Sequence, residues 1–141
     1  MTMIKKSPWI SLINSSGCNG CTIECLPLIT PKYDIERFGA VLKHSVRHVD
    51  ILLVTGPTNE KTKHILRRIY NQTPKEKKVI AVGNCAISRC VFKKSYNCKQ
   101  NLDEIIPVDM YVPGCPPKPE AIIHAILKLL GCFDEVKKTK S

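Results

Sequence analysis

The feature that most restricts the fold of this chain is the alternation of short apolar runs with segments of helical periodicity. The apolar runs predict buried strands, and they cover residues 9–13, 49–55, 78–82 and 108–112. Residues 59–71 and 119–130 instead carry their apolar side chains on one helical face. Strands that are apolar throughout, separated by amphipathic helices, are typical of a parallel sheet covered on both faces.

Two further segments add less to this pattern. Residues 22–28 favour the start of a helix that ends near Pro27 or Pro31, whereas residues 33–41 predict no single element. The sequence therefore predicts an α/β fold, a flavodoxin-like doubly wound parallel sheet of four to five strands with helices on both faces. Because crossovers between parallel strands are right-handed, every strand-to-helix loop should lie on one edge of that sheet.

The length of the chain fits one domain that folds on its own hydrophobic core. A chain of 141 residues buries roughly two-thirds of its unfolded surface, so disulfides are not needed for folding. No apolar run approaches the ~20 residues of a membrane span. The first residues contain neither the apolar stretch of a signal peptide nor a twin-arginine pair. We expect a single domain over 1–141 that is neither exported by the Sec route nor membrane-spanning.

The net charge of +10 raises the question of an acidic partner. Lysines cluster at 75–78 and at 137–140, in an expected loop and a basic tail, which is typical of a solvated surface. An acidic protein or an anionic lipid surface stays open as a partner. Aromatic residues are only 6% and do not alternate with basic ones, so we expect no nucleic-acid binding.

The eight cysteines are the unusual part of the composition. In a chain without an export signal, they favour metal binding over a disulfide framework. Cys18 and Cys21 follow the first predicted strand, Cys85 follows the third, and Cys115 follows the last. Ligands of doubly wound folds bind at the carboxyl edge of the sheet, so these four thiols are expected to converge there.

Four thiolates without histidine suit either a tetrahedral zinc or an iron–sulfur cube. The chain has one C-x-x-C pair and two isolated cysteines, not the two C-x-x-C knuckles of a zinc ribbon, which favours the cluster. Zinc and a redox disulfide remain alternatives. Glycines flank the cysteines and would let the backbone approach a bulky centre closely, at positions 17, 20, 83 and 114.

The remaining cysteines are interpreted as buried or surface thiols, at positions 25, 90, 98 and 132. Cys25 is a possible substitute ligand, but we expect it one helical turn from Cys21 and facing the core. Glu24 has two interpretations: a first-turn carboxylate that complements a helix dipole, or a proton-carrying carboxyl beside the cluster. The four histidines have no metal-like spacing and are expected at the surface, at positions 44, 48, 64 and 124.

Five motifs in order resemble the family of [NiFe]-hydrogenase small subunits and the 20 kDa (PSST-type) subunit of complex I. They are G-C-N-G-C-T-I-E at 17–24, V-D-I-L-L-V-T-G at 49–56, L-R-R-I-Y at 66–70, G-N-C-A at 83–86 and V-D-M-Y-V-P-G-C-P-P at 108–117. The likeness covers residues 8–131, which leaves 132–141 as a basic tail. It implies one [4Fe-4S] cluster on Cys18, Cys21, Cys85 and Cys115, beside the active site of a larger partner subunit. It also implies that Glu24 lies at the interface, on a proton path to the partner's metal centre.

Departures from the family pattern indicate which type of subunit within the family this chain resembles most. Asn19 and Gly20 separate the first cysteines, as in hydrogenases, whereas complex I subunits usually carry them adjacent. Uptake hydrogenase small subunits continue with further clusters, but this sequence ends soon after Gly131, like the energy-converting membrane-bound types (Ech-type and methanogen types). Cys90 falls where many relatives have a small residue, so an extra ligand stays open.

The resemblance therefore implies an enzyme subunit whose catalytic metal lies in its partner. It would pass electrons between a ferredoxin-like iron–sulfur subunit and the nickel–iron centre of the hydrogenase large subunit. Integral membrane subunits of the same complex would hold it peripherally at the cytoplasmic face of the cell membrane. The alternatives are the corresponding subunit of a complex I-like quinone or methanophenazine oxidoreductase, or of a sulfane-reducing complex, and more remotely a zinc-binding interaction module.

Overall fold

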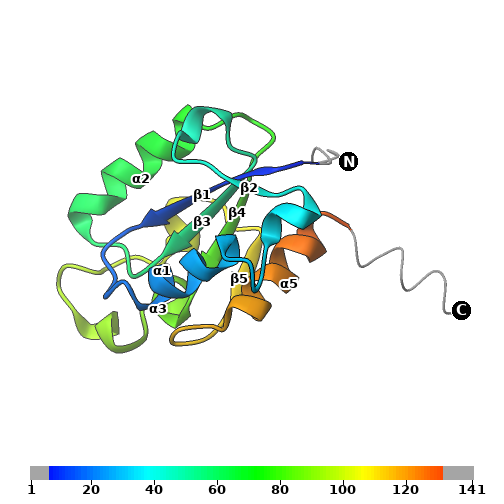
Figure 1. Ribbon diagram of the computed structural model, residues 1–141. Helices are drawn as coiled ribbons and strands as arrows, with labels where there is room; N and C mark the ends of the chain where they lie inside the picture. Colours follow the sequence, from blue (N-terminus) through cyan, green and yellow to red (C-terminus); the bar gives the residue numbers. More distant parts are fainter. Residues whose placement is uncertain (1–6, 132–141) are drawn as a thin grey trace, which may run out of the picture.

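A five-stranded parallel sheet forms the centre of the computed structural model, which describes residues 7–131 (Figure 1). The strands are β1 (Trp9–Asn14), β2 (Val41–Leu42), β3 (Ile51–Thr55), β4 (Lys78–Val82) and β5 (Met110–Val112). They lie in the order β2-β1-β3-β4-β5, and every neighbouring pair is parallel. This is the strand order of flavodoxin-like doubly wound sheets, so the predicted fold class is confirmed. The basic tail 132–141, with Cys132, lies outside the described residues.

Helices cover both faces of this sheet (Figure 1). The α-helices are α1 (Gly20–Cys25), α2 (Glu60–Gln72), α3 (Asn84–Ser88), α4 (Leu102–Ile105) and α5 (Pro119–Leu129). Short 3₁₀ segments connect them, namely η1 (Leu26–Ile29), η2 (Ile35–Phe38), η3 (Val46–His48) and η4 (Cys90–Lys94). None of the helices in residues 7–131 is long and apolar enough to cross a membrane.

The central strand β3 separates two hydrophobic cores. Ile51 and Leu53 point to the face that α1, η1 and α5 cover, where they pack in one cluster with Ile122. Leu52 and Val54 point to the opposite face, which α2, α3 and α4 cover. Because successive side chains of a strand alternate between faces, a strand covered on both sides must be apolar at every position. The run of apolar residues that the sequence shows here has this physical reason.

Two strands begin later than the apolar runs predict, and an aspartate marks each start. The predicted strands 49–55 and 108–112 begin at Ile51 and Met110. The Asp50 carboxylate accepts a hydrogen bond from the Trp9 N–H at 3.0 Å, and the Asp109 carboxylate accepts one from the Val79 N–H at 2.9 Å. In both places a side-chain oxygen replaces the main-chain carbonyl that would have extended the ladder.

The helix predicted at 59–71 is α2, shifted by one residue because Asn59 is its N-cap. The Asn59 Oδ1 accepts from the Thr62 N–H at 2.8 Å, and the Thr62 Oγ1 accepts from the Asn59 N–H at 3.1 Å. The predicted helix 119–130 is α5 and ends one residue earlier. The helix expected within 22–28 begins already at Gly20 and changes into η1 at Leu26.

Candidate metal centre

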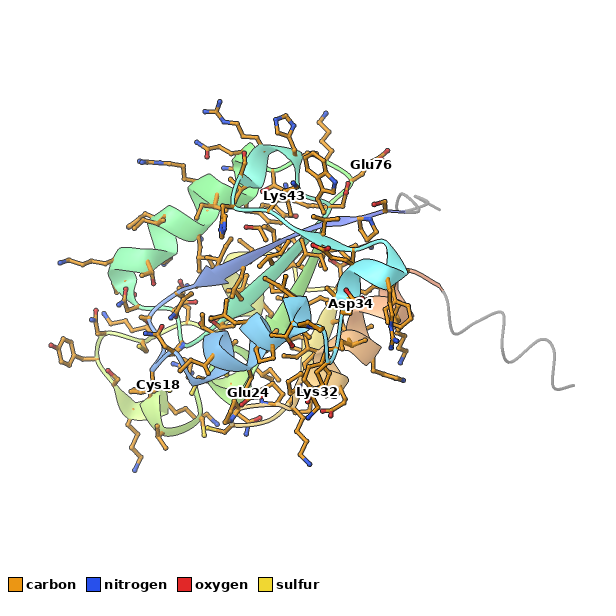
Figure 2. The ribbon with its side chains drawn as sticks, in the orientation of Figure 1. Cys18, Glu24, Lys32, Asp34, Lys43 and Glu76 are labelled. Carbon is orange, nitrogen blue, oxygen red and sulfur yellow. The ribbon has the colours of Figure 1, made fainter. Side chains whose placement is uncertain are left out.

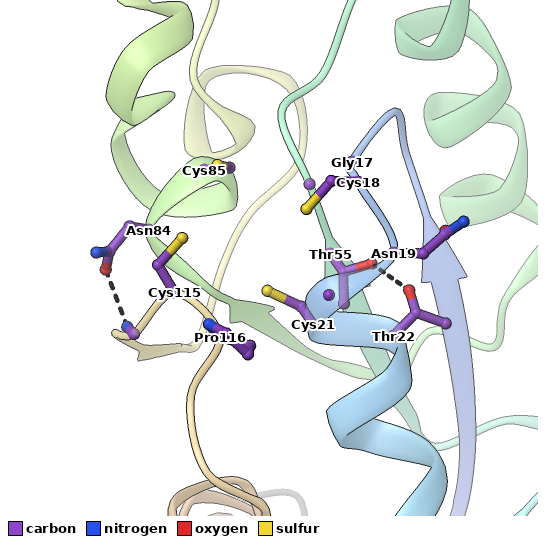
Figure 3. Close-up of a pocket in the computed structure, with 13 residues that line it drawn as sticks. Gly17, Cys18, Asn19, Cys21, Thr22, Thr55, Asn84, Cys85, Cys115 and Pro116 are labelled. Carbon is purple, nitrogen blue, oxygen red and sulfur yellow. Dashed lines mark hydrogen bonds between the residues drawn. The ribbon is translucent and has the colours of Figure 1, made fainter.

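The loops at the carboxyl edge of the sheet enclose a cavity of about 170 Å³. Cys18 and Cys21 reach it from the loop after β1 and the first turn of α1. Cys85 reaches it from the first turn of α3, and Cys115 from the loop after β5. Figure 3 shows the sulfurs of Cys18, Cys21 and Cys115 directed into the space between α1 and α3. The topology thus brings together the four cysteines that the sequence singles out, and their role as ligands stays a prediction.

A glycine allows Cys21 to approach the loop after β4 closely. Gly83 has φ +93° and ψ 155°, a region that residues with a side chain rarely enter. A Cβ at this position would lie 2.5 Å from the Cys21 Sγ. The thiol of Cys21 therefore occupies the space that a side chain at 83 would fill.

Asn84 fixes the loop after β4 to the loop after β5. Its N–H donates to the Gly114 carbonyl oxygen at 2.9 Å, and its Oδ1 accepts from the Gly114 N–H at 2.9 Å (Figure 3). The Gly83 N–H donates to the Val112 carbonyl oxygen at 2.8 Å. These bonds set the position of Cys85 relative to Cys115.

The loop that carries Cys18 is fixed in a similar way on the other side of the cavity. The Asn14 Oδ1 accepts from the Gly17 N–H at 3.0 Å, and the Asn14 Nδ2 donates to the Asn19 Oδ1. The Thr22 and Thr55 hydroxyls lie 3.3 Å apart and share a hydrogen bond (Figure 3). Both sides of the cavity are therefore held by hydrogen bonds that do not involve the thiols.

The four thiols lie close enough to interact electrostatically. Burial raises the pKa of Cys21, and the neighbouring Cys85, Cys115 and Cys18 raise it further. Burial also raises the pKa of Cys85, with Cys115, Cys90 and Cys18 adding to the effect. Thiolates in this cavity repel one another, so a cationic centre between them would stabilise the charged forms.

The spacing of the donor groups bears on the kind of centre that fits. Tetrahedral zinc with Zn–S bonds of about 2.3 Å needs its sulfurs about 3.8 Å apart. Within residues 7–131, no three His, Cys, Asp or Glu side chains are grouped so that they could hold one metal ion. Four thiols line the cavity, and four cysteines are the usual ligands of an iron–sulfur cube as well as of a structural zinc, so the cluster stays a prediction.

The other predicted residues lie outside the cavity lining. Cys25 is part of the core beneath α1, where burial raises its pKa to about 12, so it faces the core as expected. Cys98 is buried and Cys90 is exposed. Glu24 is half-buried on α1 and makes no hydrogen bond or ion pair within the described residues; Figure 2 shows it at the same end of the molecule as Cys18. The histidines are exposed, as predicted, at positions 44, 48, 64 and 124.

The sequence reasoning missed five polar or small residues of the cavity lining, two of which, Asn19 and Thr22, lie beside the first cysteines. Thr55 and Gly56 line the cavity from the end of β3, and Asn84 lines it from the start of α3. None has ligand chemistry, so a search for thiols passes over them. The signal for Thr55 and Gly56 is positional, since β3 ends at the same edge of the sheet as β1 and β4.

The chain is similar to subunits of several oxidoreductases. The family model Oxidored_q6, "NADH ubiquinone oxidoreductase, 20 Kd subunit", matches residues 18–129. The probable membrane-bound hydrogenase subunit mbhJ of Pyrococcus furiosus is 50% identical over 90% of this chain and 76% of its own length. One subunit of the F(420)H(2) dehydrogenase of Methanosarcina mazei is 42% identical over 89% of this chain and 66% of its own length.

One solved structure is similar in both sequence and fold. A chain of the membrane-bound sulfane sulfur reductase, an archaeal respiratory membrane complex, is 41% identical with a TM-score of 0.78. The match covers 90% of this chain and 70% of that one. The fold and the sequence therefore point to the same set of oxidoreductase complexes.

Proposed function

Since the chain belongs to the family of the 20 kDa subunit of NADH ubiquinone oxidoreductase, we propose that it is the electron-transfer small subunit of a membrane-associated, energy-converting [NiFe]-hydrogenase. The family that the sequence motifs indicate is confirmed, and with it a place in an oxidoreductase complex. The observation that carries the proposal is that four cysteines from three separate loops line one cavity.

In this proposal the thiolates of Cys18, Cys21, Cys85 and Cys115 hold a [4Fe-4S] cluster. The cluster, when bound, supplies a store for one electron at a time. The protein fixes the four ligands through the hydrogen bonds of Asn14 and Asn84 described above. Cys18 and Cys115 are exposed, so the cavity opens to the surface where a partner subunit can cover it.

Apolar side chains next to the cavity support a partner on the α1 side. Ile23 is 60% exposed, and Leu26 and Ile29 follow it on η1 with 51% and 43% exposed. Exposed apolar side chains that lie in one place mark protein–protein contacts. We assign this surface to the large subunit that holds the nickel–iron centre, with Glu24 carrying a proton on its carboxylate at the interface.

The cluster is tested by iron and sulfide analysis of the anaerobically purified chain, together with EPR after reduction. Wild type should bind four irons and four sulfides per chain, as the composition of a [4Fe-4S] cluster requires. Cys115→Ser should abolish or alter the EPR signal, whereas Cys98→Ala, which removes a buried thiol outside the cavity, should keep it. An unchanged spectrum of Cys115→Ser, or stoichiometric zinc without iron, would contradict the proposal and favour the zinc-binding module.

The role of Glu24 is tested by Glu24→Gln in the assembled complex, with Glu104→Gln at an exposed position of α4 as the control. The amide keeps the shape of the side chain but cannot take up a proton. Hydrogen evolution should fall about tenfold or more in Glu24→Gln, since a positioned proton carrier contributes at least this much. The EPR signal should be the same in both variants. Full activity of Glu24→Gln would show that protons take another route.

A second candidate function keeps the same site with a different partner. The similarity to a chain of the sulfane sulfur reductase complex and to the F(420)H(2) dehydrogenase chain favours this possibility. The spaced pair Cys18 and Cys21 favours the hydrogenase. The large subunit encoded next to this chain decides between them. Two C-x-x-C pairs for nickel, with H₂ production by the purified complex, support the hydrogenase, and their absence supports the alternative.

The same proposal includes a ferredoxin-like iron–sulfur subunit as the electron donor. It also includes integral membrane subunits that hold this chain peripherally at the cytoplasmic face of the cell membrane. Washing membranes with carbonate tests this arrangement, because carbonate should release the chain only together with its peripheral partners. Release of the chain alone, with the large subunit left behind, would contradict it.

A further inference from the structure

Helix α3, which presents Cys85 to the cavity, is too short to be stable on its own. It has five residues, Asn84–Ser88, whereas an isolated helix needs about 12–15 residues even to be marginally stable in water. Among its side chains only that of Ala86 is buried. Contacts at its two ends must therefore hold the helix, and Asn84 supplies those at its start through the bonds to Gly114.

The end of α3 is formed by Arg89 in a conformation that an arginine rarely adopts. Arg89 has φ +64° and ψ −10°, in the left-handed region, and Cys90 follows with φ +43°. The Arg89 N–H donates to the Cys85 carbonyl oxygen at 3.1 Å, so this turn closes directly on a residue that lines the cavity. The left-handed conformation is unfavourable for residues with a Cβ and persists only where other contacts determine it.

The side chain of Arg89 makes such contacts. Its Nη1 donates to the carbonyl oxygens of Cys98 at 2.7 Å and Lys99 at 2.8 Å, and its Nε donates to the Asn101 Oδ1 at 2.8 Å. Arg89 is half-buried, and within residues 7–131 no carboxylate forms an ion pair with it. Because all three acceptors are neutral, the guanidinium acts here through its geometry, as a planar group that holds several donors at fixed angles.

The three acceptors belong to a segment that is itself anchored in the core. Cys98 is 6% exposed, and Asn101 is the N-cap of α4. Leu102, the first residue of α4, packs in one hydrophobic cluster with Ala86 of α3. The Arg89 side chain therefore joins the end of α3 to a fixed part of the molecule.

We propose that Arg89 is a positioning residue for the candidate metal centre: it clamps the end of α3 to residues 98–101 and thereby fixes Cys85 relative to the other thiols. The use of this position for a [4Fe-4S] cluster rests on the proposed function. Asn84 and Arg89 hold the two ends of α3, and Cys85 lies between them. Without the guanidinium the strained turn after Ser88 loses the contacts that maintain it, so α3 opens more often.

The test separates the side chain of Arg89 from its backbone conformation. Arg89→Gly removes the clamp but accepts a positive φ without strain. Arg89→Lys keeps the charge but cannot reproduce the planar group of donors. Lys77→Ala is the matched control, because the Lys77 Nζ also donates to two main-chain carbonyl oxygens, those of Tyr70 and Thr73. Lys77 lies directly before β4, at the opposite edge of the sheet from the cavity.

Hydrogen exchange of the apo chain measures the clamp directly. Peptides that cover α3 should exchange about tenfold faster or more in Arg89→Gly than in wild type, the factor expected for one lost hydrogen bond to a charged group. Arg89→Lys should lie between the two. Lys77→Ala should change the exchange of α3 less than about twofold, although urea unfolding should show that it lowers the stability of the whole chain.

The chain with its cluster reconstituted measures the effect on the site. Release of iron to a ferrous chelator should follow the same order as the exchange rates. The EPR signal of the reduced cluster should shift or broaden in Arg89→Gly, because Cys85 is less firmly held. The signal of Lys77→Ala should match that of wild type.

Exchange of α3 at the wild-type rate in Arg89→Gly would overturn the clamp. So would equal acceleration in Arg89→Gly and Lys77→Ala, since lower global stability would then explain both. Faster exchange of α3 with iron release and an EPR signal like those of wild type would overturn the positioning of Cys85. Exchange needs no cluster, so failure of the proposed function appears separately, as a missing [4Fe-4S] signal in wild type.

Discussion

At the scale of single residues, the cavity depends on the absence of a side chain at Gly83. The Cys21 thiol occupies the space in which a Cβ of residue 83 would stand. The sequence predicted that glycines beside the cysteines matter, because small residues gather there, and it identified the thiols by their place after each strand. It could not predict which glycine touches which sulfur, since that contact joins β4 to α1 through the folded sheet.

Gly83→Ala should therefore impair the site as well as the fold. The backbone conformation alone should cost about 1–3 kcal/mol in the free energy of unfolding. Gly131→Ala is the control, because Gly131 also has positive φ, at +74°, but has open space around its Cβ position. Urea unfolding should show a loss for both variants, and iron content should fall only for Gly83→Ala. Normal iron content of Gly83→Ala would mean that the present position of the Cys21 thiol is not required for binding iron.

Cys90 offers a second prediction at this scale. Its thiol raises the pKa of Cys85 but does not line the cavity. Cys90→Ser should therefore keep the iron content and the EPR signal of wild type. A changed signal, with Cys98→Ala unchanged, would instead assign Cys90 as an extra ligand, the possibility that its unusual place in the family left open.

At the scale of elements, long apolar or amphipathic segments were predictable and short ones were not. Strands β1 and β4 and helices α2 and α5 appear close to the predicted ranges, because each repeats one pattern over five residues or more. Strand β2 has only two residues and lies partly in a segment for which no element was predicted. The starts of β3 and β5 were placed too early because Asp50 and Asp109 act through side-chain hydrogen bonds that hydrophobicity does not show.

The connection between the loops after β4 and β5 can be tested through Asn84. Asn84→Ala removes the acceptor of the Gly114 N–H, which should cost about 1 kcal/mol in the free energy of unfolding. Because this bond sets Cys115 relative to Cys85, the variant should also lose its cluster faster under a chelator. Asn71→Ala, at an exposed position of α2, should change neither quantity. Equal cluster loss in the two variants would show that the backbone bonds alone hold the loops.

At the scale of the whole molecule, the two hydrophobic cores are built almost entirely without the residues of the cavity. Among the four cysteines, only Cys21 packs against a core cluster, and it does so from the edge. The strand order could be predicted in outline from right-handed crossovers, and with it the meeting of the thiols. The spacing of those thiols could not be predicted, because it depends on loop conformations that no periodic pattern encodes.

Removal of the proposed cluster should consequently leave the fold in place. After iron is removed with a chelator and an oxidant, the far-ultraviolet circular dichroism should stay native, since both cores remain. The unfolding midpoint should fall, because a group bound only by the native state stabilises it. Serum albumin treated in parallel controls for effects of the reagents. Loss of the helical signal on iron removal would show that the cores do not suffice.

The arrangement of the sheet also sets an order of events during biosynthesis. Cys18 leaves the ribosome early, but Cys115 follows the last strand, β5, and Cys85 follows β4, the strand beside it in the sheet. A nascent chain that lacks β5 cannot present a complete set of donors. Under the proposed function, any machinery that inserts iron and sulfide must therefore wait for a chain that includes β5, and a prematurely terminated chain would be left without a cluster.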